Sequence, residues 1–260
     1  RDELKQYEMQ IAPNLKDSNC LRFFIGDIRD QHRLDLAMRD VDIVIHAAAL
    51  KRIEVAEYNP FECIKTNILG SQNIVDTAIK NKVKKVISLS TDKATNPANL
   101  YGASKLASEK IFVAANNLSG SISTRFASVR YGNVLGSRGS VLEIFKECIN
   151  LNKNDFPITD ERMTRFWISL QKGVSFVISC LQIMNGGEIF VPKLPSSKVT
   201  DLAIALDSKK RLKFIGKKPG EKLHEILISQ DEAFSTLDIG DRYVVEPAFK
   251  WWQNTDKKLY

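Results

Sequence analysis

The 260-residue sequence lacks several features that mark particular classes of protein. Its four cysteines, Cys20, Cys63, Cys148 and Cys180, lie far apart and form no CxxC pair, which argues against a disulfide framework and a cysteine metal site. Three histidines are too few for a histidine cluster. No uncharged apolar run reaches the roughly 18 residues of a membrane span. We therefore expect a cytoplasmic protein with reduced thiols, no bound metal and no membrane contact.

Repeats, low-complexity tracts and a signal-peptide pattern are also missing. The apolar content of 43%, with 13 Phe, is enough to build the core of a folded protein. The sequence begins at Arg1 rather than at Met and opens directly on a polar, helix-like stretch. We therefore expect a fragment whose beginning is missing.

Basic residues outnumber acidic ones by 38 to 31, which gives a net charge of +7. Such an excess favours an anionic partner. The basic residues are spread along the chain, and no aromatic residues interleave with the dense runs at 82–85 and 209–211, as a nucleic-acid platform would require. We expect a small anionic ligand and no nucleic acid.

Short apolar runs alternate with segments of helical spacing through the first half of the chain. The runs that predict strands are 21–25, 41–48, 83–90 and 124–134. The segments that predict helices are 31–39, 60–80 and 99–117. This alternation predicts an α/β fold with a parallel sheet and helices on both faces, and its ligands should lie beyond the carboxyl ends of the strands. We expect the run at 41–48 to be buried on both faces.

After about residue 136 the alternation loosens, and prolines separate shorter elements. We interpret residues 1–136 as a first domain and residues 137–260 as mainly a smaller, mixed substrate lobe. A brief strand is predicted at 188–191 in this lobe, and some elements of the lobe are expected to return to the main sheet.

A Tyr-x-x-x-Lys pair, Tyr101 and Lys105, follows the strand predicted at 83–90. Residues four apart share one face of a helix, so both side chains can point at one ligand. A lysine ammonium lowers the pKa of a neighbouring phenol and can hold a ribose hydroxyl, which suits proton transfer during hydride transfer to a nicotinamide. The spacing alone also fits two residues on a solvated helix face, but its place in the βαβ series favours catalysis.

The turn Ser90-Thr91-Asp92-Lys93 lies at the end of the same predicted strand. Asp92 can act as an acid if it holds a proton, and Lys93 can act as a base if it is neutral. The two residues also fit a surface ion pair worth under about 1 kcal/mol, so these residues alone leave both interpretations open. The opening Arg1 to Lys5 similarly fits either a site for the 2′-phosphate of NADP or a frayed charged terminus. His46 is expected to pack near the cofactor at a strand end.

Longer blocks of sequence resemble one known family. They are RDELKQ, GDIRD, HAAALKRIEVAEYNP, TNILGSQN, STDKATNPANLYGASK, SVRYGNVLGSRGSV and PITDERMTRFWI. Together they closely resemble the inverting UDP-N-acetylglucosamine 4,6-dehydratases, extended short-chain dehydrogenase/reductase enzymes of pseudaminic-acid and related surface-sugar biosynthesis. The resemblance implies a Rossmann-like doubly wound sheet without its first βαβ unit, a lyase, NADP, a UDP-N-acetylglucosamine substrate and a cytoplasmic homo-oligomer, either a dimer or a higher assembly such as a hexamer.

The resemblance also implies roles for residues at matching positions. The catalytic residues would be Thr91, Asp92, Lys93, Tyr101 and Lys105. The cofactor-binding residues would be Arg1, Asp2, Glu3, Leu4, Lys5, Asp27, Ile28, Ala47, Lys51, Tyr101, Lys105, Val134, Leu135, Gly136, Ser137 and Arg138. The substrate-binding residues would be Lys51, Asn133, Thr159 and Lys218. Relatives often carry Arg at the last position, so Lys218 weakens a bidentate phosphate contact.

Two departures from the family pattern affect this expectation. The first strand and its G-x-x-G-x-x-G phosphate loop are absent from the sequence, and the stretch after Tyr260 looks cut. We therefore expect this fragment to bind NADP poorly, and an equilibrium titration showing sub-micromolar affinity would contradict this. Membrane-bound relatives carry Met at the position of Tyr101, which favours the soluble, C5-inverting group.

Two alternatives stay open. A sugar-nucleotide 4-epimerase on the same fold needs no acid at C6, so Asp92 and Lys93 argue against it. A non-catalytic NADP-sensing module has no need of the residues of a reaction centre, which this sequence carries as Thr-Asp-Lys…Tyr…Lys.

Overall fold

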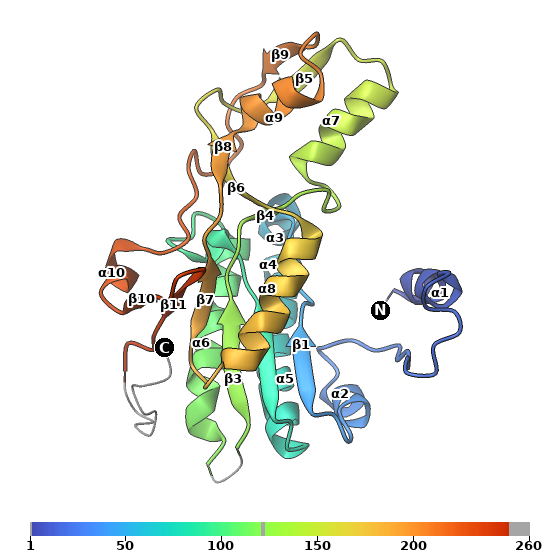
Figure 1. Cartoon of the computed structure of the whole chain (residues 1–260), viewed down its shortest axis with the longest axis vertical. Helices are drawn as coiled ribbons and strands as arrows, with labels where there is room; N and C mark the ends of the chain where they lie inside the picture. The colour runs from blue at the N-terminus through green and yellow to red at the C-terminus, as the bar shows by residue number, and fades with distance from the viewer. Residues whose placement is uncertain (1, 121–122, 250–260) are drawn as a thin grey trace.

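A six-stranded sheet, in the order β1-β2-β3-β7-β11-β10, forms the centre of the computed structural model, which describes residues 2–120 and 123–249 (Figure 1). The strands are β1 (Ile43–His46), β2 (Lys85–Leu89), β3 (Arg125–Val129), β7 (Ile189–Pro192), β10 (Thr236–Asp238) and β11 (Arg242–Val245). The first four of these in the sheet order pair in parallel, and β11 and β10 add an antiparallel edge. The predicted α/β, Rossmann-like class is confirmed.

Helices cover both faces of the sheet, because successive residues of a buried strand point to opposite sides. On one face Val86 and Phe126 pack with Val75 and Phe112, which come from two helices. On the other face Ile87 packs in a core that includes residues of a third helix. The helices are α2 (Gln31–Ala37), α3 (Ile53–Tyr58), α4 (Pro60–Ile64), a π-helical turn (Lys65–Leu69), α5 (Gly70–Lys80), α6 (Leu100–Leu118) and α8 (Leu170–Ile183).

Helix α6 is held unusually close to the turn that follows β2. The side chain of Asn99 caps its first turn by accepting a hydrogen bond of 2.8 Å from the backbone N–H of Gly102. A Cβ on Gly102 would collide with the carbonyl oxygen of Lys93, so only glycine permits this approach. The fold therefore places the first turns of α6 beside Asp92 and Lys93.

A second group of elements lies at one end of the molecule, at the top of Figure 1. It contains α7 (Val141–Asn150), β5 (Asp155–Ile158), α9 (Val199–Leu206) and β9 (Arg211–Phe214). Phe145, Phe156 and Ile158 give it a separate core. A three-stranded sheet of β4 (Asn133–Val134), β6 (Thr164–Ile168) and β8 (Ser196–Lys198) lies between this group and the main sheet. The chain then returns to the main sheet through α10 (Gln230–Ala233), β10 and β11, and the domain boundary after residue 136 stays a prediction.

Two strand predictions need correction. Residues 21–25 are not a strand, because no strand of the described residues lies beside them and a strand needs a hydrogen-bonded neighbour. β1 is not buried on both faces, since Ile43 and Ile45 are 50% and 48% exposed. β1 lies at the sheet edge, and the core under α8 is made with β2, β3, β7 and β11 instead.

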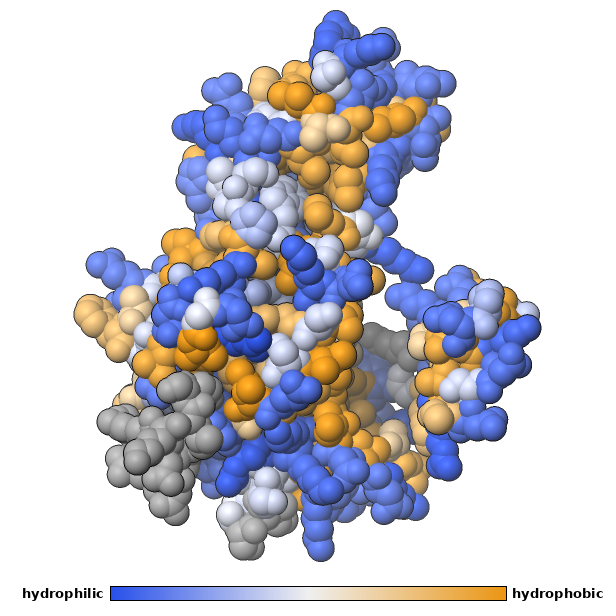
Figure 2. Space-filling view, in the orientation of Figure 1, coloured by the Kyte–Doolittle hydropathy of each residue, from blue (hydrophilic) through white to orange (hydrophobic). Residues whose placement is uncertain are grey.

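Helix α8 is itself only half covered. Leu170, Val174 and Ile178 lie four residues apart on one of its faces and are exposed, and Figure 2 shows apolar surface in this part of the molecule. Helix α1 (Glu3–Ile11) lies to one side of the sheet and has no buried residue. Within residues 2–120 and 123–249, no helix combines the length and apolarity that a bilayer span needs.

Candidate active site

Polar side chains gather beyond the carboxyl ends of β1, β2 and β3, where ligands bind in sheets of this kind. Beyond the end of β2, the N–H of Ser90 donates to the carbonyl of Val129 at 2.7 Å and the N–H of Asp92 to that of Tyr131 at 3.0 Å. The turn at 91–93 is therefore fixed to the segment that follows β3. This backbone pairing holds the turn that carries Asp92 and Lys93 in a fixed position.

Asp92 and Lys93 form a close pair inside the protein. Lys93 Nζ lies 3.0 Å from Asp92 Oδ1, and the Thr91 hydroxyl donates to the same oxygen at 2.9 Å. The side chain of Asp92 is fully buried, and its Oδ2 has no hydrogen-bond partner among the described residues. Buried carboxylate oxygens are rarely left without a donor. Asp92 thus keeps acceptor capacity that a substrate hydroxyl can use, and the surface-pair interpretation is wrong.

Tyr101 lies against this pair from the first turn of α6. Burial is the main effect on its hydroxyl and raises the pKa of Tyr101 well above the usual value, although a hydrogen bond with Thr91 opposes it. The charge of Asp92 raises this pKa further. The expected lowering by Lys105 is not found, because Lys105 is not among the groups acting on Tyr101. Tyr101 is therefore a protonated phenol that can donate a hydrogen bond.

Lys105 and His46 are buried on the inner side of Tyr101. Burial lowers the pKa of Lys105 to about 8, while the charge of Glu109 raises it. Burial, and then the charge of Lys105, lowers the pKa of His46 to about 3. The His46 ring stacks on Phe112 at 5.7 Å between centroids, and its Nε2 has no hydrogen-bond partner within the described part of the chain. His46 is therefore a neutral strand-end residue beside the lysine.

The residues predicted to hold the adenosine end of a cofactor lie on separate elements. Arg1 is outside the described residues, whereas Asp2, Glu3, Leu4 and Lys5 begin α1 and are exposed. A hydrogen bond from the N–H of Lys5 lowers the pKa of Asp2, and the charge of Arg138 adds a smaller lowering. The start of α1 therefore lies close enough to Arg138 for the charge of Arg138 to act on Asp2.

The remaining predicted cofactor residues surround the sheet edge. Ala47 and Lys51 are exposed in the segment after β1. Gly136 adopts a φ of +73° after β4, in the stretch 134–138, whose residues are exposed or half-buried. Asp27 Oδ2 binds the Arg29 guanidinium at 2.9 Å, and Arg29 also binds Glu62. Ile28 packs on Gly70 and against the core under α5. The structure therefore brings the predicted catalytic residues together, but it does not bring together the residues predicted to hold the adenosine.

The predicted substrate-binding residues lie on three different segments. Asn133 belongs to β4, and its buried Oδ1 has no hydrogen-bond partner in the described chain. Thr159 follows β5 in the upper group of elements, where a hollow of about 460 Å³ opens between α7, β5 and β9. Lys218 is exposed and binds Glu54 at 3.0 Å, so a phosphate group would have to compete with this carboxylate.

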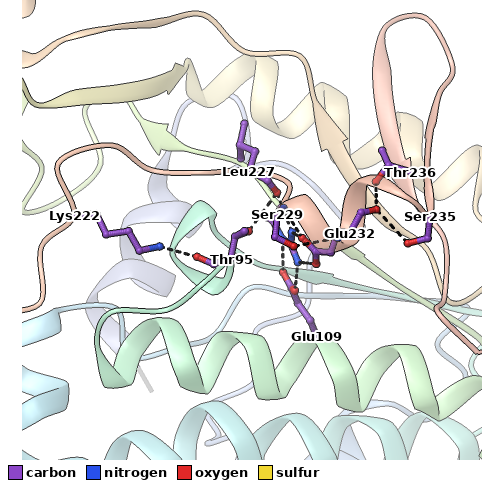
Figure 3. A network of polar contacts seen from close by, with 9 residues as sticks. Thr95, Glu109, Lys222, Leu227, Ser229, Glu232, Ser235 and Thr236 are labelled. Atoms are coloured by element: carbon purple, nitrogen blue, oxygen red, sulfur yellow. Dashed lines mark hydrogen bonds and ion pairs between the residues drawn. The ribbon is translucent and has the colours of Figure 1, made fainter.

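Sequence analysis missed two buried charged groups near the site. Glu225 Oε1 lies 3.5 Å from Lys93 Nζ. Arg130, fully buried after β3, binds Glu109 of α6 and Glu232 of α10 at 2.6 and 2.8 Å. Figure 3 shows Glu109 close to Glu232 at this point, with Glu232 hydrogen-bonded to Ser229 and Lys222 donating to the carbonyl of Thr95 nearby. No local spacing connects these residues, so only their burial reveals them.

A family model described as "Polysaccharide biosynthesis protein" matches residues 1–247. The chain belongs to this family of extended short-chain dehydrogenases/reductases, as the resemblance predicted. It is 59% identical over 250 residues to the UDP-N-acetylglucosamine 4,6-dehydratase (inverting) of Campylobacter jejuni strain 81-176, covering 96% of this chain and 74% of that protein. It is 45% identical over 247 residues to a UDP-glucose 4-epimerase of Rickettsia bellii, covering 94% and 71%.

A solved structure gives the same fold. The structure of Pen from Bacillus thuringiensis superposes with a TM-score of 0.90 at 38% identity, covering 95% of this chain and 79% of that one. The likeness extends over the main sheet and the upper group of elements together, since the covered share is nearly the whole chain.

Proposed function

We propose that the protein is a hydro-lyase that converts UDP-N-acetylglucosamine to a UDP-2-acetamido-2,6-dideoxy-hexos-4-ulose, with inversion at C5. The observation that carries this proposal is the buried pair of Asp92 and Lys93 at 3.0 Å, which supplies an acid and a base at one point. The relative with 59% identity bears the name of this reaction. The product suits surface-sugar pathways of the pseudaminic-acid type, in a cytoplasmic enzyme.

NADP is the cofactor that we assign to the site. When bound, it accepts a hydride from C4 of the sugar and returns it to C6. Lys105 would hold the nicotinamide ribose, since it is buried one helical turn from Tyr101, with the charge of Glu109 acting on its amine. Residues 134–138 would border the nicotinamide, with Ala47 and Lys51 beside it. Asp2, Glu3, Leu4 and Lys5, with Arg1, would hold the 2′-phosphate, and Asp27 and Ile28 the adenine.

The chain's own residues would carry the proton transfers. The phenol of Tyr101 is protonated in the ligand-free protein, so it has to ionise when cofactor and substrate bind if it is to take the proton of the C4 hydroxyl as the ketone forms; the alternative base for this proton is Lys93. The ketone acidifies the C5 hydrogen, and Lys93 in its neutral form takes that proton. Asp92 gives its proton to the C6 hydroxyl, which leaves as water, and Thr91 holds Asp92 in place. Reprotonation of C5 on the opposite face inverts this centre.

Substrate recognition would come from both parts of the fold. Asn133 has an unused buried oxygen that can accept from the sugar nucleotide. Thr159 and Lys218 would contact the UDP, with Lys51 between substrate and cofactor. We assign residues 1–136 mainly to the cofactor and residues 137–260 mainly to the substrate. A homo-oligomer, a dimer or a hexamer, belongs to the same proposal.

The test is incubation of the complete gene product with NADP and UDP-N-acetylglucosamine in deuterated water, followed by mass spectrometry and NMR of the product. Loss of one water with deuterium at C5 and an inverted C5 supports the proposal. The Rickettsia relative makes a 4-epimerase the second candidate, and it predicts a product of unchanged mass without deuterium at C5. Either that result or the absence of any product would contradict dehydration.

A further inference from the structure

Lys93 is held by two carboxylates that come from distant parts of the sequence. Its Nζ lies 3.0 Å from Asp92 Oδ1 and 3.5 Å from Glu225 Oε1, and its side chain is 19% exposed. An ammonium has three N–H donors. One N–H is used by the hydrogen bond to Asp92 and Glu225 lies within ion-pair distance, so an N–H stays available to a substrate on the exposed side.

Glu225 is a buried acidic residue, and such a residue costs stability in a segment whose role is only structural. Its side chain is 3% exposed, and a buried carboxylate is costly unless cations pair with it. Its second oxygen lies 3.5 Å from Lys222 Nζ, which also donates to the carbonyl of Thr95 at 2.6 Å. Asp92, Lys93, Glu225 and Lys222 therefore form a chain in which acidic and basic side chains alternate.

The segment that carries Glu225 is fastened without it. Asn99 donates to the carbonyl of Gly220 at 2.9 Å, and Arg130 donates to that of Leu227 at 2.9 Å. Thr95 also donates to Leu227, at 3.3 Å. These bonds hold the segment on both sides of Glu225. The segment therefore does not need the Glu225 carboxylate to stay in place, and this carboxylate lies against Lys93 instead.

We propose that Glu225 is a positioning residue for Lys93 that stabilises the ammonium formed when Lys93 takes the C5 proton. This rests on the dehydration proposed above. In that step the C5–H bond breaks and its proton goes to Lys93 Nζ. The electron pair forms the C5–C6 double bond, and the C6 hydroxyl leaves with the proton of Asp92. The Glu225 carboxylate lies 3.5 Å from Lys93 Nζ, so the ammonium formed by this transfer has a carboxylate within ion-pair distance.

The first test compares E225Q with wild type in the complete enzyme with NADP and UDP-N-acetylglucosamine. E221Q is the matched control, because it removes the same charge from the same segment without a contact to Lys93. E225Q should lower kcat and the rate of C5 exchange with deuterated water together by about tenfold or more, part of what acid–base catalysis supplies, with KM unchanged. E221Q should behave as wild type. Wild-type kcat and C5 exchange in E225Q, or equal losses in E221Q, would overturn the proposal.

A second test needs no substrate. Acylation of Lys93 by acetic anhydride in the ligand-free protein, read by peptide mass spectrometry, should be about two- to fivefold faster in E225Q, the size expected for a lost, partly exposed ion pair. Exposed Lys80 in the same sample should react at an unchanged rate. Unchanged labelling of Lys93 would contradict the proposed contact. If wild type fails to remove water from the substrate, the proposed function fails, and this assay still decides whether Glu225 holds Lys93.

Glu225→Asp serves if E225Q does not fold. It keeps the buried charge but withdraws it by one methylene from Lys93. A smaller change of the same sign in both assays supports the proposal, and wild-type values in both overturn it.

Discussion

Two buried charged clusters lie a short way apart in this protein, and they are satisfied to different degrees. In the cluster of Arg130, Glu109 and Glu232, four side-chain hydrogen bonds of 2.6 to 3.0 Å join the guanidinium to the two carboxylates, and the Leu227 carbonyl takes another N–H. At the reaction centre, by contrast, Asp92 Oδ2 and His46 Nε2 have no hydrogen-bond partner among the described residues.

The difference fits a division between a cluster that holds the fold and the proposed reaction centre, which would bind a ligand. A fully paired buried charge cannot accept another partner without breaking a bond, whereas an unpaired buried atom retains that capacity. The pKa shifts agree with this division. Arg130 helps to lower the pKa of Glu232 to about 2, against the effect of burial, whereas burial moves the pKa of Lys105 to about 8. The first cluster should therefore respond to mutation in stability and the second in activity and pH dependence.

The largest effect is expected at the reaction centre. Asp92→Asn or Lys93→Met should lower turnover of UDP-N-acetylglucosamine by about 10³-fold, because each removes a group that moves a proton. Product formation by mass spectrometry measures the rate, and circular dichroism checks that the variants fold. Near-wild-type rates in either variant would sink the assigned roles.

The next effect is on stability. Arg130→Met should lower the free energy of unfolding by about 3–5 kcal/mol, because the buried carboxylate of Glu109 and the partly buried one of Glu232 lose their partner. Urea denaturation measures it, and Arg162→Met, which breaks an exposed pair with Asp160, should leave the midpoint unchanged. A stable Arg130→Met protein would show that the paired cluster is not what holds α6 to the C-terminal segment.

His46 should make the protein sensitive to acid. Its pKa is about 3 in the folded state and about 6.5 when unfolded, so the unfolded chain binds more protons between these values and stability is lost as the pH falls. Between pH 6.5 and pH 5 wild type should lose about 2 kcal/mol relative to His46→Gln. Urea titrations of both proteins at each pH test this. Parallel curves would mean that the buried imidazole is not held neutral.

The smallest effect is expected on the alkaline side. The folded pKa of Lys105, about 8, lies below its ordinary value of 10.5, so the unfolded chain binds more protons above pH 8 and stability rises with pH. From pH 8 to pH 9 wild type should gain about 1 kcal/mol over Lys105→Met. The same denaturation series measures it, and a difference that stays constant with pH would refute the shift.

The part of the site that sequence could predict is the part made by neighbours in the chain. Tyr101 and Lys105 share a helix that follows a strand and a polar turn, so their spacing together with their place in the chain predicted that both side chains face one ligand. The environment of these residues could not be predicted in the same way. Burial of the Tyr101 hydroxyl depends on packing, and it shifts the pKa of Tyr101 in the direction opposite to the expected one. Glu225 could not be found in this way, since its contact with Lys93 exists only after the chain has folded back.

The errors in the fold have the same origin. Apolar content predicted a strand at 21–25, but hydrogen bonding to a neighbouring strand decides whether a strand forms. The composition of 41–48 indicated burial on both faces, but the coverage of Ile43 and Ile45 depends on where α8 lies. The local sequence pattern predicts where helices and strands lie. The elements that pack against them decide whether a strand forms and which of its residues are buried.

The bond from Thr95 to Leu227 joins residues 132 positions apart and closes the reaction centre with a late part of the chain. During synthesis on a ribosome, β2 and α6 emerge long before the segment that carries Glu225. A nascent chain can therefore form the parallel strands before Glu225 reaches Lys93. The second carboxylate would reach Lys93 only once the segment around residue 225 has packed against the turn that follows β2.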